Sequence, residues 1–243
     1  MPDMIIEQLR SLRLTAFSEA LEQQRQQPTT FAELGFEERL TLLLDSELMG
    51  RENNRIKRLR KQAKFRLAAL PERLDYSPER ALKKTIVAEL LNGNYLSRQQ
   101  NILLTGATGC GKTYLACAFG EQAVRQQHTV RYYRLGRLLD ELDTARLDGS
   151  YRQQLLRLSK ITLLILDDWG LEQLTKTQAG DLLEVMEDRY RLGSTIIASQ
   201  VPVKDWHQLI PNPTIADALL DRLVHDGQKI ALEGDTMRKR NLT

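Results

Sequence analysis

The chain has 243 residues, of which 42% are hydrophobic and 28% are charged, and its formal net charge is +3. At about 150 residues per domain this length allows one large domain, or one domain with a substantial appendage, and the composition differs from that of a disordered chain. The two cysteines and three scattered histidines argue against a disulfide framework and a structural zinc site, because they show no metal-ligand spacing.

Membrane segments and signal peptides are not expected. No apolar run approaches the roughly 18 residues that a membrane helix needs, and acidic residues interrupt the N-terminal stretch where a signal peptide would be apolar. The sequence therefore predicts a cytoplasmic protein that does not bind a membrane.

The first 70 residues are predicted to be helical throughout. Leu, Glu, Gln, Arg and Ala dominate this region, and its only glycines are Gly35 and Gly50. One helical run ends before Pro28, and a second begins near Phe36 and continues past residue 50.

The second helical run leads into a strongly basic segment, residues 51–66. This segment has eight Lys or Arg against the single Glu52, whereas residues 1–50 have four Arg and nine Asp or Glu. At 100° per residue its apolar side chains fall on one face, at Ile56, Leu59, Ala63 and Leu67. The remaining surface is positive, which favours a polyanion such as DNA over the alternative of a merely solvated helix. The expected DNA-binding residues are Arg51, Arg55, Lys57, Arg58, Arg60, Lys61 and Lys64.

Beyond Pro71 and Pro78, which are typical of a linker, short apolar runs alternate with helical patterns. The runs span 101–106, 128–135, 161–168, 194–200 and 228–234, and helices are expected near 112–126, 135–147, 177–192 and 213–226. This alternation predicts an α/β fold with a parallel sheet covered by helices on both faces. We therefore expect a helical domain over 1–70 and a second domain over 71–243.

A phosphate-binding loop follows the first predicted strand. Residues 106–113 match the pattern G-x-x-x-x-G-K-[ST], with a strand before them and a helix, opening at Tyr114, after them. Glycines allow backbone N–H groups to converge on phosphate oxygens, and the helix N-terminus favours the negative charge. The expected ATP-binding residues are Gly106, Ala107, Thr108, Gly109, Cys110, Gly111, Lys112, Thr113 and Tyr114, with Lys112 reaching the β- and γ-phosphates and Thr113 binding Mg²⁺.

A second metal ligand is expected at the end of the apolar run Leu163–Leu166. Asp167 follows this buried strand and would complete a Mg²⁺ site with Thr113. Asp168 is the candidate base that polarises the attacking water. An acidic pair at this place can instead cap the following helix.

Together these motifs, the run 194–200, Asp221–His225 and the terminal segment 234–239 resemble the IstB-type insertion-sequence ATP-binding proteins. These are transposition helper ATPases of the AAA+ class, related to the DnaC helicase loaders and the DnaA initiator. The resemblance implies an AAA+ core, an all-α N-terminal domain and a short helical C-terminal lid.

The resemblance also implies roles for four further positions. Ser199 or Gln200 would occupy sensor 1 beside the γ-phosphate, Arg222 would be an arginine finger acting on a neighbouring subunit, and Arg238 would be sensor 2. Arginine suits both of the last two tasks, because its planar charged fork pairs with phosphate oxygens. Asp168 departs from the glutamate that many AAA+ proteins have.

The implied function is that of an ATP-dependent protein that assembles as a ring or helical homo-oligomer on duplex DNA and assists the transposase of the same insertion element. A replicative helicase loader is the nearest alternative, since it shares the ATPase core. Two further alternatives are a small-molecule P-loop kinase and an ATP switch that does not hydrolyse its nucleotide.

Overall fold

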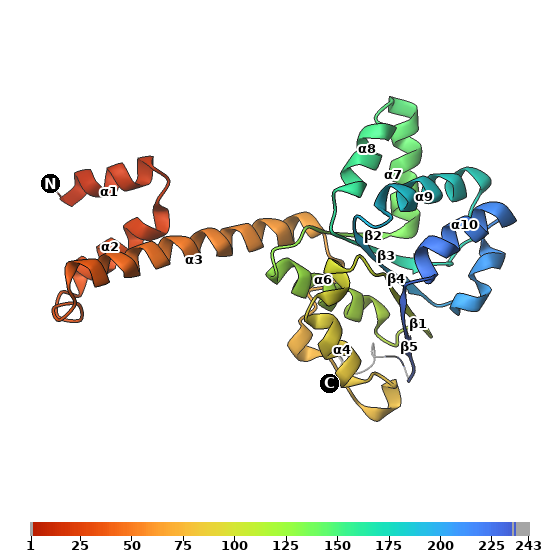
Figure 1. Ribbon diagram of the computed structural model, residues 1–243, viewed down its shortest axis with the longest axis horizontal. Helices are drawn as coiled ribbons and strands as arrows, with labels where there is room; N and C mark the ends of the chain where they lie inside the picture. The colour runs from red at the N-terminus through yellow and green to blue at the C-terminus, as the bar shows by residue number, and fades with distance from the viewer. Residues whose placement is uncertain (1, 235, 237–243) are drawn as a thin grey trace. The chain divides into compact units, whose positions relative to one another are not determined.

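The computed structural model describes residues 2–234 and 236 and divides into two compact units, Met1–Arg58 and Leu59–Thr243 (Figure 1). The first unit contains α1 (Pro2–Ser11), α2 (Thr15–Gln26) and most of α3 (Phe36–Ala63). Within it, the buried Glu47 side chain of α3 accepts a hydrogen bond from the backbone N–H of Phe17, 3.1 Å away in the first turn of α2. This contact ties α2 to α3, and the helical prediction for this region is confirmed.

The second unit is built on one five-stranded parallel sheet in the order β2-β3-β4-β1-β5. The strands are β1 (Ile102–Gly106), β2 (Val130–Arg134), β3 (Leu163–Trp169), β4 (Ser194–Ser199) and β5 (Gln228–Leu232). Four of them lie within the apolar runs that the sequence predicts, and β3 extends one residue past its run, to Trp169. The α/β class with a parallel sheet is confirmed.

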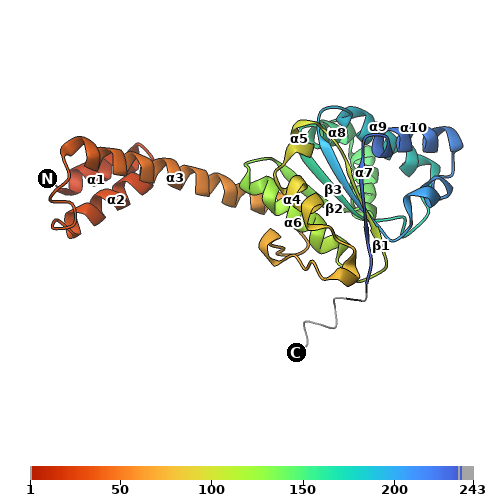
Figure 2. The ribbon, with the colours of Figure 1, turned by 60° about the horizontal axis from the view of Figure 1, so that its bottom comes forward.

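Helices cover both faces of this sheet (Figures 1 and 2). Helices α4 and α6 lie on one face and α7, α8, α9 and α10 on the other. Alternate side chains of β2 point to the two faces of the sheet. Tyr133 packs against the helices α7–α10. Tyr132 lies on the other face beside Ile165, which α6 covers. The helices and 3₁₀ turns are α4 (Lys84–Leu91), α5 (Asn94–Ser97), α6 (Lys112–Arg125), α7 (Leu135–Asp148), α8 (Tyr151–Ser159), α9 (Lys176–Arg189), α10 (Pro213–Val224), η1 (Pro71–Arg73), η2 (Pro78–Arg80) and η3 (Val203–Leu209).

The end of α3 belongs to the second unit. Leu59 and Ala63 are buried, and Arg60 forms two hydrogen bonds of 2.8 and 2.6 Å to the buried Glu121 of α6. These contacts explain why the units divide inside α3, N-terminal to the boundary after residue 70 expected from the sequence. The prediction that Leu67 continues the apolar face is wrong, because α3 ends at Ala63 and Leu67 is 41% exposed.

The helical lid expected at the C-terminus lies outside the described residues. Among the residues that are described, no helix is long and apolar enough to cross a membrane.

A buried arginine joins the starting ends of β3 and β4. The Arg189 guanidinium at the end of α9 donates to the carbonyl oxygens of Leu158, Ile161 and Ser194 at 2.5, 2.7 and 2.7 Å. Burial lowers the pKa of Arg189 to about 10, so this side chain remains charged at neutral pH. A charged guanidinium that donates to three carbonyl oxygens is a strong link between these elements, because charge-assisted hydrogen bonds are stronger than neutral ones.

We predict that Arg189→Met lowers the free energy of unfolding by about 3 kcal/mol, since three buried carbonyls lose a charged donor. Urea denaturation measures the effect. Arg191→Met is the matched control, because Arg191 is exposed and its loss should cost less than about 0.5 kcal/mol. Equal denaturation midpoints for the two variants would contradict the prediction.

Candidate ATP-binding site

The expected site residues meet at one edge of the sheet, where β1, β3 and β4 end. These strands are neighbours in the order β3-β4-β1, and all run in the same direction. The loop after β1 therefore lies near Asp167 at the end of β3 and Ser199 at the end of β4, as ligand sites of open parallel sheets do.

The phosphate-binding loop depends on glycines at two close approaches. A Cβ atom on Gly106 would lie 2.2 Å from the carbonyl oxygen of Leu232, and one on Gly111 would lie 2.3 Å from the Arg80 guanidinium. Both residues also have positive φ, of 147° and 94°. The loop leads directly into the first turn of α6, whose N–H groups favour an anion.

The Lys112 ammonium group lies over this loop. Its Nζ donates to the carbonyl oxygens of Gly106 and Ala107 at 2.7 and 2.8 Å, and the residue is only 8% exposed. The positive charge is thus held within the loop that would surround the phosphates.

Thr113 and Asp167, the two residues predicted to hold Mg²⁺, are in direct contact. The Thr113 hydroxyl donates to Asp167 Oδ2 at 2.7 Å, and the carboxylate is 2% exposed. A hydroxyl and a carboxylate are the hard oxygen donors that Mg²⁺ prefers, so this pair fits the ion.

Two further donors fix the Asp167 carboxylate. The Tyr132 hydroxyl donates to the same Oδ2 at 2.7 Å, and the N–H of Asp168 donates to Oδ1 at 2.9 Å. Burial, together with the bond to Asp167, raises the pKa of Tyr132, so this phenol stays a donor at physiological pH. Sequence analysis missed Tyr132. The apolar run 128–135 predicts a strand there, but it does not predict that this strand pairs with the strand that carries Asp167.

Asp168 lies at an irregularity of β3. Leu166 pairs with Ile197 and Trp169 with Ser199, so β3 has one extra residue here, and Asp168 adopts φ = 61°. Its carboxylate forms ion pairs with Arg134 at 2.7 Å and Arg66 at 3.5 Å. Two arginine side chains therefore bind the carboxylate of the candidate base, and the sequence analysis identified neither of them.

The two sensor 1 candidates have different environments. Ser199 is buried, and its hydroxyl donates to the carbonyl of Trp169 at 2.8 Å while accepting from the N–H of Val201 at 3.0 Å. Gln200 is exposed, and its side-chain oxygen accepts a 2.7 Å hydrogen bond from Thr108 in the phosphate-binding loop. Of the two, Gln200 is the side chain in contact with the loop.

Arg222 lies at the opposite edge of the sheet. Its carbonyl accepts a 2.9 Å hydrogen bond from Asn101, the residue before β1, and its guanidinium bonds Glu187 at 2.8 Å. Five residues of β1 separate this edge from the phosphate-binding loop, or about 16 Å at roughly 3.3 Å per residue. An arginine so placed is too far to reach the loop of its own chain.

The remaining predicted residues are distributed as follows. Tyr114 contacts the backbone of Leu70 through its hydroxyl, and Arg238 lies outside the described residues. Arg51 and Arg60 are engaged in ion pairs with Glu47 and Glu121. Five further cations of the segment are exposed and form no ion pair with any residue that the structure describes, namely Arg55, Lys57, Arg58, Lys61 and Lys64.

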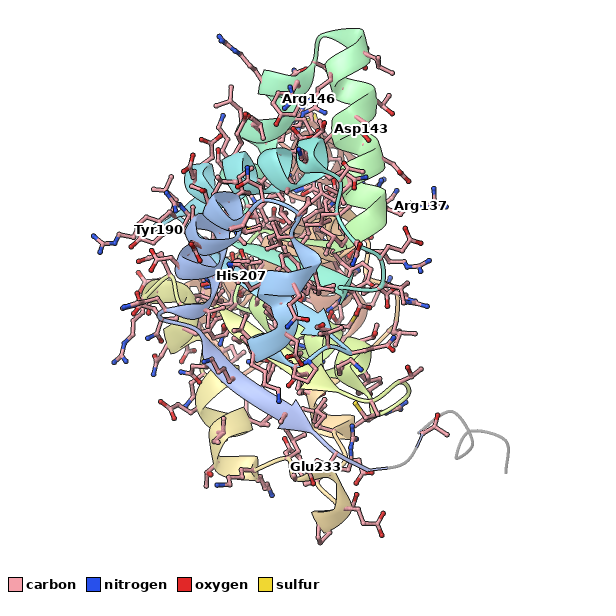
Figure 3. The ribbon with its side chains drawn as sticks, turned by 90° about the vertical axis from the view of Figure 1, so that its right-hand side faces the viewer. Arg137, Asp143, Arg146, Tyr190, His207 and Glu233 are labelled. Carbon is pink, nitrogen blue, oxygen red and sulfur yellow. The ribbon has the colours of Figure 1, made fainter. Side chains whose placement is uncertain are left out.

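Arg80 is a buried arginine behind the loop that sequence analysis assigned only to a linker. Its guanidinium donates to the carbonyl of Cys110 at 2.5 Å, and its own carbonyl accepts from the N–H of Glu233 at 3.2 Å. Figure 3 labels Glu233 just beyond the arrow of β5. Arg80 therefore connects the phosphate-binding loop to the end of β5.

The sequence profile described as "IstB-like ATP binding protein" matches residues 7–243. The relative y4pL of Sinorhizobium fredii, named as an insertion sequence ATP-binding protein, is 41% identical over 238 residues, covering 96% of this chain and 95% of its own. An ATP-binding protein of insertion sequence IS1162 from Pseudomonas fluorescens is 47% identical over 198 residues, covering 81% and 85%.

Two solved structures share the fold. Aquifex aeolicus DnaA bound to AMPPCP matches with a TM-score of 0.60 at 19% identity, over 71% of this chain and 52% of the DnaA chain. This chain thus spans about half of that structure. The DnaC helicase loader matches with a TM-score of 0.56 at 19% identity, over 73% of this chain and 99% of the loader. At these identities the likeness concerns the fold alone.

The contact between Arg80 and the loop generates a prediction. We expect Arg80→Met to weaken binding of a fluorescent ATP analogue about tenfold, because a charge-assisted hydrogen bond of roughly 1.5 kcal/mol no longer holds the loop. Arg73→Met is the control, since Arg73 is exposed on the preceding 3₁₀ turn. Unchanged affinity in a folded Arg80→Met protein would show that the loop keeps its shape without this arginine.

Proposed function

Because the chain belongs to the IstB-like ATP-binding proteins, an insertion-sequence family with an AAA+ fold, we propose that it is a DNA-binding ATPase. It assembles on duplex DNA and assists a separate transposase. The single observation that best supports hydrolysis is the 2.7 Å contact between Thr113 and Asp167 beside the phosphate-binding loop.

In the proposed mechanism, Lys112 and the N–H groups of the loop bind the phosphates, and Thr113 and Asp167 hold Mg²⁺. Mg²⁺ held there would supply positive charge against the negative charge that develops as the γ-phosphoryl group passes to water. Asp168 orients and deprotonates the attacking water, which requires its carboxylate to exchange the ion pair with Arg134 for that water. Gln200, the residue after β4, contacts the γ-phosphate, and Arg238 is proposed as a second contact to it.

The assembly is proposed from the position of Arg222. Since this side chain lies at the edge of the sheet opposite the loop, the phosphates it contacts belong to a neighbouring subunit. A small-molecule kinase with an isolated active site would not need such an arginine. The helicase loader alternative rests on a likeness of fold at 19% identity, whereas the family assignment supports a role in an insertion element.

We predict that Arg222→Ala and Lys112→Ala each abolish ATP turnover and that mixing them restores part of it. Some interfaces of the mixed assembly pair an intact loop with an intact arginine, and an arginine supplied in trans contributes about 10³–10⁵ in kcat in well-studied GTPases. Steady-state phosphate release with duplex DNA measures the effect.

Arg222→Ala mixed with wild-type protein serves as the positive control for mixed assembly. If the two inactive variants enter mixed oligomers and the mixture stays inactive, Arg222 does not act between subunits. Turnover by Lys112→Ala alone would instead contradict the proposed nucleotide site.

DNA binding is proposed for the exposed cations of residues 51–66. We expect the triple variant Arg55→Glu, Arg58→Glu and Lys61→Glu to weaken binding to all duplex sequences about equally, because phosphate contacts carry little sequence information. The slope of log K against log salt should fall by about three, since each lost phosphate contact removes roughly one released counterion. Fluorescence anisotropy at several salt concentrations measures both quantities.

A control triple with the same change in net charge reverses exposed cations of the second unit, Arg98, Arg152 and Lys176. An equal loss of affinity in both triples would mean that net charge alone matters. A sequence-selective loss would indicate contacts with base edges instead of phosphates.

A further inference from the structure

A series of interacting side chains connects the end of the basic segment with Asp167, the proposed Mg²⁺ ligand. Arg66 is the last residue of that segment, and hydrogen bonding to the Tyr132 hydroxyl raises the pKa of Arg66. Tyr132 in turn donates to Asp167 Oδ2 at 2.7 Å. Neither Tyr132 nor Arg66 has a role in the proposed mechanism, although both contact its metal ligand.

Tyr132 orients the carboxylate. Asp167 receives hydrogen bonds from three elements, namely Thr113 of α6, Tyr132 of β2 and the N–H of Asp168 in β3. Tyr132 is 7% exposed and lies on the α6 side of the sheet, so the geometry of its hydroxyl is fixed by packing. Partners of this kind orient a metal ligand, and their loss typically weakens metal binding.

Arg66 acts on the same carboxylate with the opposite effect. Its Nη1 atom lies 3.8 Å from Asp167 Oδ2 and 3.5 Å from Asp168 Oδ2, and its side chain is 42% exposed. A guanidinium at this distance neutralises the two carboxylates. It therefore competes electrostatically with any other cation that binds them.

We propose that Tyr132 and Arg66 are positioning residues that set the Mg²⁺ requirement of the site in opposite directions, Tyr132 strengthening and Arg66 weakening metal binding. We further infer that Arg66 transmits the presence of DNA on the basic segment to the metal. The inference rests on the proposed function, which supplies both Mg²⁺ and DNA.

The link to DNA follows from the position of Arg66 in the chain. The exposed Lys61 and Lys64 precede it by a few residues, and α3 ends at Ala63. Phosphates bound by these lysines attract the Arg66 guanidinium as well, and its partly exposed ion pairs are the weaker kind. DNA on the segment thus draws Arg66 away from Asp167 and frees this carboxylate for the metal.

The test titrates Mg²⁺ against the full chain with a fluorescent ATP analogue, so that binding is read without hydrolysis. Tyr132→Phe should raise the half-saturating Mg²⁺ concentration about tenfold. Arg66→Gln should lower it by about two- to fivefold, as expected for a partly exposed ion pair. General loosening of the fold would shift both variants in the same direction, so the opposite signs distinguish the proposal from a structural role.

Matched controls are available for both changes. Tyr133→Phe removes an equally buried hydroxyl that donates to Glu141 at 2.9 Å on the other face of the sheet. Arg73→Gln removes an exposed charge on η1. Both controls should keep the half-saturating Mg²⁺ concentration of the wild type.

The proposal is overturned if Tyr132→Phe behaves like Tyr133→Phe, or if Arg66→Gln raises the half-saturating Mg²⁺ concentration. Should Tyr132→Phe fail to fold, the sign of the Arg66→Gln shift still decides.

Duplex DNA supplies the final comparison. It should lower the half-saturating Mg²⁺ concentration of the wild type and leave that of Arg66→Gln unchanged. An equal effect of DNA on both proteins, or none on the wild type, overturns the link through Arg66. A wild-type protein that binds neither nucleotide nor DNA would count against the proposed function, whereas normal wild-type binding with unshifted variants would count against this inference alone.

Discussion

The hydrogen bond between Thr113 and Asp167 is the contact on which the arrangement of the site depends. It joins the helix after the phosphate-binding loop to the end of β3, although the two residues are separated by β2, α7 and α8 in the chain. The contact forms because β3 and β1 end at the same edge of a parallel sheet, on either side of β4. The contact thus holds the phosphate-binding loop next to the end of β3, where Asp168 is the proposed base.

Arginines support this arrangement in several different ways. Arg80 and Arg189 are buried and donate to backbone carbonyls, so they hold loops and strand ends together. Arg60 anchors the end of α3 through Glu121. Arg66 and Arg134 lie instead on the carboxylate of Asp168. A guanidinium suits all of these places because it presents several donors in a fixed plane and keeps its charge when partly desolvated.

The basic segment shows how one stretch of sequence can serve two purposes. Its periodicity places apolar residues on one side, and Leu59 and Ala63 indeed pack into the second unit. Arg60 adds a specific ion pair, whereas the exposed cations beside it have no such partner among the described residues. A count of positive charges cannot separate these roles, because only the neighbouring elements decide which cations are neutralised within the protein.

The sequence by itself determined the α/β class, the positions of all five strands and the residues of the phosphate-binding loop. Apolar periodicity and the glycine-lysine pattern are local, and they need no knowledge of what lies beside them. Pairing across the sheet was decided only by the tertiary structure. Tyr132 and Arg66 reach Asp167, Arg80 reaches Cys110, and Gln200 instead of Ser199 touches the loop. These contacts join residues far apart in the chain, and they depend on strand order, on the extra residue in β3 and on the end of α3 at Ala63, none of which a single sequence encodes in a local pattern.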